Sequence, residues 1–370
     1  MSESRLHQLS RLGQSVWIDS ISREWLRSGF LEKLIREDAV VGVTSNPTIF
    51  QKAIASGDAY DEQLREVIAR TDDAKEIFWE LAIKDIKDAC DVLRPVWDEG
   101  SGKDGYVSLE VDPTLAYDRE ATFEQAMHLH DVVDKRNLFV KIPATEPGLG
   151  AIEDSIARGK PINVTLIFSL QRYREVVEAY VRGVERLVED GGDPTTVASV
   201  ASFFVSRVDT EADARLEKIG TEEALALRGK LAIANAKLAY AHYLEIVGSE
   251  RWQKLAAAGA TPQRCLWAST STKNPDYRDV LYVEELIGPD TVNTMPLETI
   301  EAFQDHGEVR ATLAEGLDDA KRLLDDLARV GVDYDDVTDT LEREGVQKFS
   351  DSFEELLDGV RAKRGDLAAA

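Results

Sequence analysis

Lys141 lies in a short apolar run, Leu138-Phe-Val-Lys-Ile-Pro143, that is typical of a β-strand. It is the only lysine of the chain with strand-like apolar residues on both sides. Burial disfavours the charged form of an amine, so we expect its pKa to fall from about 10.4 toward neutrality. A neutral, half-buried amine is a nucleophile that forms a Schiff base with a carbonyl group. The alternative is a lysine at a strand end whose alkyl stem covers apolar surface while its charge stays in water.

Other strand-like runs also contain polar residues near their ends, where a barrel interior is normally apolar. Two carboxylates, Asp19 and Glu110, could act as acid and base beside the amine. Neutral groups that could hold substrate hydroxyls are Asn46, Asn163, Thr165 and Ser202. A single Asp, Asn or Thr at a strand end is as often a helix N-cap or a turn residue. Their recurrence on six successive runs favours a catalytic site.

Two cations downstream could bind a phosphate group. Arg207 follows the run Ser202-Phe-Phe-Val-Ser206, and Lys273 lies in the hydroxyl-rich segment Ser269-Thr-Ser-Thr-Lys-Asn274. Hydroxyls and a lysine near an arginine can cradle a phosphate. Each cation could equally form a surface salt bridge, and the spacing alone does not decide between these interpretations.

The composition excludes some classes of partner. The formal net charge is −25 over 370 residues, without a basic block, so the positive surface that nucleic acid or an anionic membrane requires is missing. No apolar run approaches the ~20 residues that span a bilayer, and the N-terminus has no apolar signal-peptide core. Cys90 and Cys265 suit reduced core thiols. We therefore expect a cytoplasmic protein, and the sequence leaves open whether it is a monomer or a homodimer.

No metal or other cofactor is expected from the residue patterns. His128 and His130 are two residues apart on a helical run and point to different faces. The acidic residues around Tyr334 lack the glycine and terminal glutamate of a calcium-binding loop. The pair Gly148 and Gly150 lacks the third glycine of a dinucleotide fingerprint.

Eight strand-like runs alternate with segments of helical periodicity. They cover residues 15–19, 40–45, 106–111, 138–142, 162–168, 197–205, 264–269 and 291–294. Alternation of strand and helix predicts a parallel sheet of the α/β class, and eight repeats predict closure into a (β/α)8 TIM barrel. An open doubly wound sheet ranks second, because no Gly-rich dinucleotide loop follows the first run.

We expect one domain over residues 1–370, with the barrel at about 15–300. A mostly helical insertion at about 49–103 has its clearest helix at 74–96, and a second helical gap at 209–262 has its main body at 222–247. The segment from about 301 to 370 contains periodic leucines and no strand. It predicts helices packed outside the barrel.

Five motifs resemble those of transaldolases, in the longer bacterial form of that family. They are Gly42-Val-Thr-Ser-Asn-Pro-Thr-Ile-Phe50, Val107-Ser-Leu-Glu-Val-Asp-Pro113, Val140-Lys-Ile-Pro-Ala144, Ile162-Asn-Val-Thr-Leu-Ile-Phe168 and Ser202-Phe-Phe-Val-Ser-Arg207. The resemblance runs from about Val16 to Ile300 and is specific as an ordered set. It implies a (β/α)8 barrel and transfer of a dihydroxyacetone unit between sugar phosphates in the non-oxidative pentose phosphate pathway. The donor would be sedoheptulose 7-phosphate or fructose 6-phosphate, and the acceptor glyceraldehyde 3-phosphate or erythrose 4-phosphate.

The resemblance also implies a role for each candidate residue. Lys141 would form the imine, and Asp19 would take the proton of the C4 hydroxyl as the C3–C4 bond breaks. Glu110, with a water held partly by Thr165, would move protons during imine formation and hydrolysis. The substrate-binding residues would be Asn46, Asn163, Ser202 and Phe204 around the dihydroxyacetone unit, and Arg207, Ser271 and Lys273 at the phosphate.

The chain departs from the family's better-known members at the phosphate, where they pair two arginines and it has Arg207 and Lys273. A lysine binds phosphate as a point charge, without the bidentate fork. The nearest alternative is a fructose-6-phosphate aldolase; those relatives are shorter and tend to carry glutamine and tyrosine at Glu110 and Phe204. A non-catalytic binding barrel is the other alternative, and it would not need Lys141 and both carboxylates together.

Overall fold

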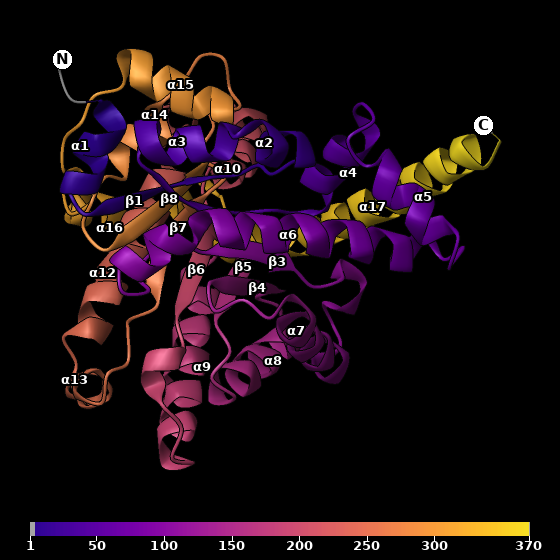
Figure 1. Cartoon of the computed structure of the whole chain (residues 1–370). Helices are drawn as coiled ribbons and strands as arrows, with labels where there is room; N and C mark the ends of the chain where they lie inside the picture. Colours follow the sequence, from indigo (N-terminus) through magenta and orange to yellow (C-terminus); the bar gives the residue numbers. More distant parts are fainter. Residues whose placement is uncertain (1–3, 370) are drawn as a thin grey trace.

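The computed structural model describes residues 4–369 and is built around a closed barrel of eight parallel strands in sequence order (Figure 1). The strands are β1 (Gln14–Ile18), β2 (Val40–Val43), β3 (Val107–Glu110), β4 (Leu138–Pro143), β5 (Ile162–Ile167), β6 (Ser199–Phe204), β7 (Arg264–Ala268) and β8 (Thr291–Met295). Strand β8 pairs with β1, so the barrel has no open edge. The predicted TIM barrel is confirmed, and each strand overlaps one of the eight predicted runs.

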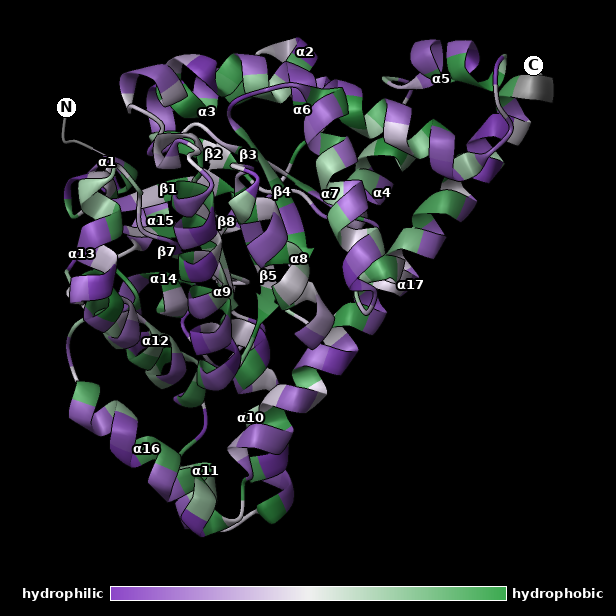
Figure 2. Cartoon of the chain, turned by 90° about the horizontal axis from the view of Figure 1, so that it is seen from below, coloured by the Kyte–Doolittle hydropathy of each residue, from purple (hydrophilic) through white to green (hydrophobic). Residues whose placement is uncertain are grey.

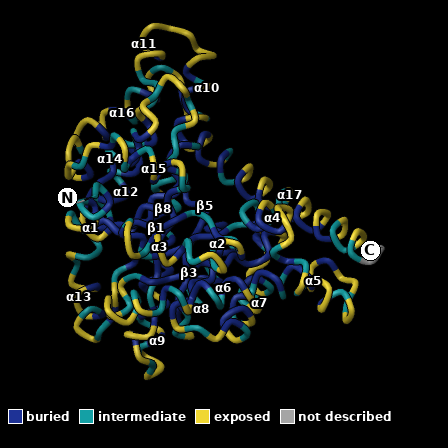
Figure 3. Tube along the Cα trace, turned by 45° about the horizontal axis from the view of Figure 1, so that its top comes forward, coloured by how far each residue is buried: buried dark blue, intermediate teal, exposed yellow. Residues whose placement is uncertain are grey.

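Helices surround the barrel; some pack on its strands, and others pack on neighbouring helices. They are α1 (Arg5–Arg11), α2 (Arg23–Ser28), α3 (Phe30–Asp38), α4 (Pro47–Ala55), α5 (Asp61–Ile68), α6 (Ala74–Glu99), α7 (Arg119–Val133), α8 (Glu146–Ala157), α9 (Leu170–Glu189), α10 (Ser206–Ile219), α11 (Glu222–Leu225), α12 (Leu231–Val247), α13 (Glu250–Ala257), α14 (Leu281–Glu285), α15 (Leu297–His306), α16 (Leu317–Val330) and α17 (Tyr334–Ala369), with 3-10 turns η1 (Pro113–Leu115) and η2 (Pro194–Thr196). Figure 3 shows the strands as the buried centre and the exposed residues on the outer helices. Among residues 4–369, no helix has the length and apolarity needed to cross a membrane.

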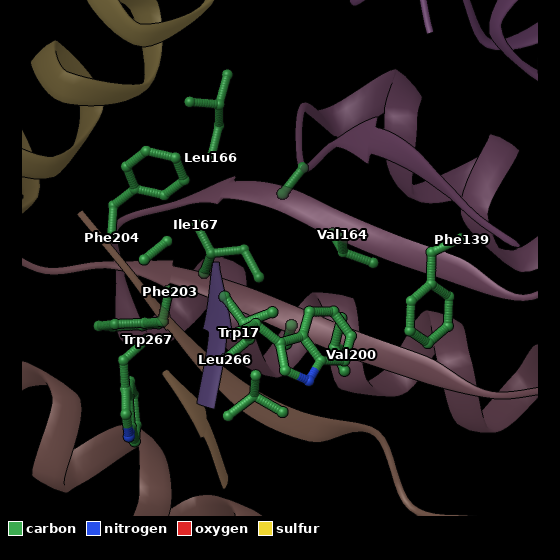
Figure 4. Close-up of a cluster of buried hydrophobic side chains, with 14 of the residues drawn as sticks. Trp17, Phe139, Val164, Leu166, Ile167, Val200, Phe203, Phe204, Leu266 and Trp267 are labelled. Atoms are coloured by element: carbon green, nitrogen blue, oxygen red, sulfur yellow. The ribbon is translucent and has the colours of Figure 1, made fainter. Parts of the chain in front are cut away.

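Large apolar side chains fill the space between strands and helices (Figure 4). Trp17, Phe203 and Trp267 are almost fully buried. The rings of Phe203 and Trp267 meet edge to face, with centroids 6.2 Å apart, a favourable aromatic geometry. Leu166 and Phe204 lie toward the same end of the strands, away from Phe139. Cys90 and Cys265 are buried free thiols, as predicted.

The predicted helix at 74–96 is confirmed as α6, which begins after the N-cap Asp73. The predicted helical body at 222–247 is helical but divided, because the chain breaks between α11 and α12. Gly229 in this break has φ +69°, and its N–H donates to Asp213 Oδ1 at 2.9 Å. The tertiary hydrogen bond and the left-handed backbone stop a helix that the periodicity alone would continue.

Helix α17 is the longest helix described and packs against α4, α6, α10 and β5. In Figures 1 and 2 it runs along one side of the barrel to a C-terminus far from the N-terminus. Thr48 Oγ1 in α4 donates to Ser352 Oγ at 3.0 Å. The ring of Phe353 packs edge to face on Phe78 of α6, with centroids 5.5 Å apart.

Helix α10, which follows β6, is tied to its neighbours by the buried Asp209. The N–H of Ala232 donates to Asp209 Oδ1 at 2.7 Å, and the hydroxyl of Tyr282 donates to Oδ2 at 2.8 Å. Burial is the largest influence on this carboxyl and raises its pKa from 3.8 to about 7, against the effect of these hydrogen bonds. The carboxyl therefore keeps its proton in the folded chain where the unfolded chain has released it.

Asp209→Asn should flatten the dependence of stability on pH. Since the folded pKa is raised, the stabilising effect of this proton is complete below about pH 4 and is lost as pH rises through 7. At about 1.4 kcal/mol per pKa unit, the wild type should lose on the order of 4 kcal/mol of unfolding free energy over this window relative to the variant. Urea denaturation of both proteins from pH 4 to 8 measures the difference. Asp190→Asn, at an exposed site, is the control, and parallel curves for wild type and Asp209→Asn would contradict the prediction.

Candidate active site

The carboxyl ends of the strands surround a cavity of about 330 Å³. Nine of the eleven candidate residues line it: Asp19, Asn46, Lys141, Thr165, Ser202, Phe204, Arg207, Ser271 and Lys273. Glu110 and Asn163 lie just behind this wall, each in contact with a lining residue. This end of a (β/α)8 barrel is where such enzymes carry their active sites.

Lys141 and Glu110 form a buried ion pair. They are register partners on β4 and β3, and Lys141 Nζ lies 3.1 Å from Glu110 Oε2, with both side chains less than a tenth exposed. The amine also donates to the carbonyl oxygen of Ser45 at 3.0 Å. Burial raises the pKa of the Glu110 carboxyl, and the neighbouring Lys141 opposes that rise. The pair is thus placed for proton exchange between amine and carboxylate.

Asp19, directly after β1, lies at the edge of the same cavity. Its Oδ1 accepts from the hydroxyl of Thr44 at 2.6 Å, and Thr44 Oγ1 lies 2.6 Å from Thr294 Oγ1. Burial raises the pKa of Asp19, whereas the Thr44 hydrogen bond and the charges of Lys141 and Arg207 lower it. A buried carboxyl with a raised pKa beside these cations is placed to accept and return a proton.

Asn163 of β5 joins Ser202 of β6 and Ser108 of β3 in a short hydrogen-bond network. Asn163 is the register partner of Lys141; its Oδ1 accepts from Ser202 Oγ at 2.6 Å and its Nδ2 donates to Ser108 Oγ at 3.1 Å. The buried hydroxyl of Thr165 and Oε1 of Glu110 have no hydrogen-bond partner among residues 4–369. Buried polar atoms of this kind are normally satisfied, so these two atoms fit a bound water or substrate group.

Asn46 combines the two roles that its sequence position suggested. Its Oδ1 accepts from the N–H of Ile49 at 3.0 Å and caps helix α4. The residue also lines the cavity. Capping therefore explains the residue type at this position without excluding contact with a substrate.

Arg207 and Lys273 both face the cavity and form no salt bridge within the part of the chain that the structure describes. Lys273 Nζ donates to Ser271 Oγ at 2.7 Å. The guanidinium carbon of Arg207 lies 5.2 Å from the centroid of the Phe204 ring, and Nη1 is buried without a hydrogen-bond partner among residues 4–369. Burial lowers the pKa of Arg207, while Glu110 and Asp19 oppose the fall. This geometry favours the phosphate interpretation over a surface salt bridge.

Several lining residues were not identified from the sequence: Thr44, Lys52, Thr294, Glu298 and Phe349. Thr44 lies two residues before Asn46 and could have been found from its alternation with it at the end of a strand. Lys52 adds a cation from helix α4. The sequence does not indicate which face of this helix points toward the cavity. Phe349 comes from α17, and no local pattern indicates that this helix reaches the cavity. Among residues 4–369, no group of three or more His, Cys, Asp or Glu side chains is placed to hold a metal ion.

The parallel barrel carries a buried lysine on its fourth strand, a carboxylate on its third and another directly after its first, which are the groups that Schiff-base chemistry requires. A family model described as Transaldolase/Fructose-6-phosphate aldolase matches residues 16–360. The chain belongs to the transaldolase/fructose-6-phosphate aldolase family. The match extends well past Ile300, where the resemblance expected from the sequence ended, and includes most of α17.

Close relatives cover nearly the whole chain. A protein of Frankia alni named transaldolase is 55% identical over 361 residues, which is 97% of each chain. A transaldolase of Thermobifida fusca is 56% identical over 358 residues, 96% of this chain and 97% of the relative. A transaldolase of Mycolicibacterium paratuberculosis is 54% identical over 365 residues, 98% of each chain.

Lys141→Met should make stability fall more steeply as pH rises. Loss of the cation leaves Glu110 buried without its counter-charge and raises its pKa further. The protonated Glu110 carboxyl adds to the free energy of unfolding below about pH 4, and this contribution is lost as pH rises through the raised pKa. Chemical denaturation from pH 4 to 8 should show the variant losing stability relative to wild type. In the double variant Lys141→Met/Glu110→Gln this trend should disappear, and its persistence would contradict the pairing.

Proposed function

We propose that this chain is a transaldolase that carries a dihydroxyacetone unit from a ketose phosphate to an aldose phosphate on Lys141. The observation that carries the proposal is the buried amine of Lys141, 3.1 Å from the Glu110 carboxylate and in one cavity with Asp19 and Arg207. The named relatives support the same reaction.

Imine formation uses the Lys141–Glu110 pair. The amine passes a proton to Glu110 and attacks the C2 carbonyl of the donor. A C–N bond forms, the carbonyl π bond opens onto oxygen, and a proton moves from the nitrogen to that oxygen to give a hydroxyl. Glu110 then protonates the departing hydroxyl, which leaves as water. The free Oε1 of Glu110 and the Thr165 hydroxyl are suited to hold this water.

Cleavage of the C3–C4 bond uses Asp19. This carboxylate accepts the proton of the C4 hydroxyl, the C3–C4 electron pair moves into the protonated imine, and the first aldose phosphate leaves as an aldehyde. The resulting enamine attacks the aldehyde of the acceptor, and Asp19 returns its proton to the new hydroxyl. Water then hydrolyses the imine and releases the new ketose phosphate. The cationic imine acts as the electron sink, and the nearby carboxylate stabilises it.

The remaining residues hold the substrate. Asn46, Asn163 and Ser202 are placed to bind the hydroxyls of the three-carbon unit, and Phe204 gives the pocket an apolar wall. Arg207, Lys273 and Ser271 are assigned to the phosphate, where Arg207 can supply two parallel N–H donors. We expect the reaction in the cytoplasm, where the buried thiols Cys90 and Cys265 would stay reduced.

Borohydride reduction during turnover of fructose 6-phosphate should add a dihydroxyacetone-sized mass to the peptide that contains Lys141. Lys141→Ala should show no adduct and no turnover, with its circular dichroism unchanged, because among residues 4–369 Lys141 is the lysine that pairs with Glu110, whereas Lys52 and Lys273 line the cavity without such a partner. Mass spectrometry of the digested protein locates the adduct. An adduct on another lysine refutes the assignment of the nucleophile.

Asp19→Asn is the matched variant for this experiment. It keeps the amine but removes the base for C3–C4 cleavage, so kcat should fall by roughly 100-fold or more. Borohydride should now trap the whole six-carbon donor on Lys141 instead of the three-carbon unit. A three-carbon adduct that forms as fast as in wild type would assign the base elsewhere.

Dependence on the acceptor separates transfer from simple cleavage. With fructose 6-phosphate and erythrose 4-phosphate, glyceraldehyde 3-phosphate and sedoheptulose 7-phosphate should appear in equal amounts. Without an acceptor, release should stop after about one equivalent per active site, because the enamine is held in a closed pocket away from proton donors. Sustained release without an acceptor would favour the fructose-6-phosphate aldolase alternative.

A further inference from the structure

Helix α17 brings one aromatic ring from the C-terminal segment into the cavity. Phe349 lines the cavity and is 6% exposed. The centroid of its ring lies 5.9 Å from Lys141 Nζ and 5.8 Å from the guanidinium carbon of Arg207. The ring therefore lies within cation–π distance of both Lys141 and the proposed phosphate ligand Arg207.

Arg207 is held by aromatic rings instead of by a carboxylate. Phe204 lies 5.2 Å and Phe349 5.8 Å from the guanidinium carbon, within the range of cation–π attraction. Among the residues from 4 to 369, none forms a salt bridge with Arg207, and Nη1 is buried without a hydrogen-bond partner. Contact with ring faces restrains the guanidinium and leaves its N–H donors free for an anionic ligand.

The position of Phe349 is set by close packing one turn earlier on α17. A Cβ atom added to Gly345 would lie 3.1 Å from Leu166 Cδ2 and 3.3 Å from the ring of Phe168, so glycine lets the helix approach β5. Leu166 itself has φ +59° at a register shift that follows Thr165. A backbone conformation with positive φ destabilises the folded chain at a leucine by on the order of 1–3 kcal/mol. The packing that seats α17 thus depends on a strained residue next to the site.

We propose that Phe349 is a positioning residue that holds Arg207 for a phosphate group of the substrate. Without the ring, Arg207 is free to turn toward Asp19 and Glu110, whose charges already act on it. The phosphate would then lose its ligand while Lys141 remains able to form the imine. Only the identity of the phosphate compound rests on the proposed transaldolase function.

Replacement of the ring should change KM more than kcat. Phe349→Leu keeps an apolar side chain but removes the ring face, so the KM for fructose 6-phosphate should rise roughly 10-fold, with kcat changed much less. Phe349→Tyr retains the face and should restore KM. Steady-state kinetics of the three proteins measure this split. A fall in kcat with unchanged KM overturns the proposal.

Two further variants distinguish an effect through Arg207 from a loss of packing. When Phe349→Leu is combined with Arg207→Ala, KM should rise no further than in Arg207→Ala alone. A full additional 10-fold rise would refute action through Arg207. Phe353→Leu, one turn further along α17, removes a ring that packs on Phe78 outside this cavity. It should leave KM unchanged, and a rise equal to that of Phe349→Leu would assign the effect to the seating of the helix.

Binding of inorganic phosphate tests the proposal without turnover. Calorimetric titration should show binding to wild type and Phe349→Tyr, and roughly 10-fold weaker binding to Phe349→Leu and Arg207→Ala. If wild type fails to transfer the three-carbon unit, the proposed function is wrong, but this comparison still stands. Equal phosphate affinity in wild type and Phe349→Leu, or no binding to wild type, overturns the role of Phe349.

Discussion

The buried ion pair between Lys141 and Glu110 is the interaction on which the rest of the site depends. Charges this far from water are costly unless an opposite charge and hydrogen bonds compensate them. Register pairing of β3 with β4 supplies the carboxylate, and the Ser45 carbonyl supplies a hydrogen bond at 3.0 Å. The same pairing that makes the lysine tolerable in a barrel interior also gives it a partner for proton exchange.

The cavity has a small surplus of positive charge although the protein is strongly acidic. The net charge is −25, yet four cations meet three carboxylates in or directly behind the cavity: Lys52, Lys141, Arg207 and Lys273 against Asp19, Glu110 and Glu298. A local surplus of positive charge inside an acidic surface can attract a small anion. It does not attract a large polyanion, which would also meet the acidic surface. The acidic composition therefore limits the kind of partner without opposing a sugar phosphate as the substrate.

The C-terminal segment is connected to the site as well as to the outside of the barrel. Helix α17 packs on α4 and α6 and contacts β5 where the chain is strained at Leu166. From this position Phe349 lies within cation–π distance of Lys141 and Arg207. Substitutions where α17 meets β5, at Gly345 or Leu166, can consequently alter the cavity, since close-packed interiors transmit small shifts.

The sequence by itself determined the number and order of the strands, the barrel class and most of the polar residues around the cavity, because periodicity and residue type are local properties. Lys141, Glu110 and Asn163 could be recognised from the strands that contain them. Only the tertiary structure decided where the helical segment breaks before Leu231 and that Phe349 lines the cavity. Both depend on contacts between residues far apart in the chain, such as Asp213 with Gly229 and Gly345 with Leu166. Local patterns carry no information about such distances, which arise only when the helices pack on the closed barrel.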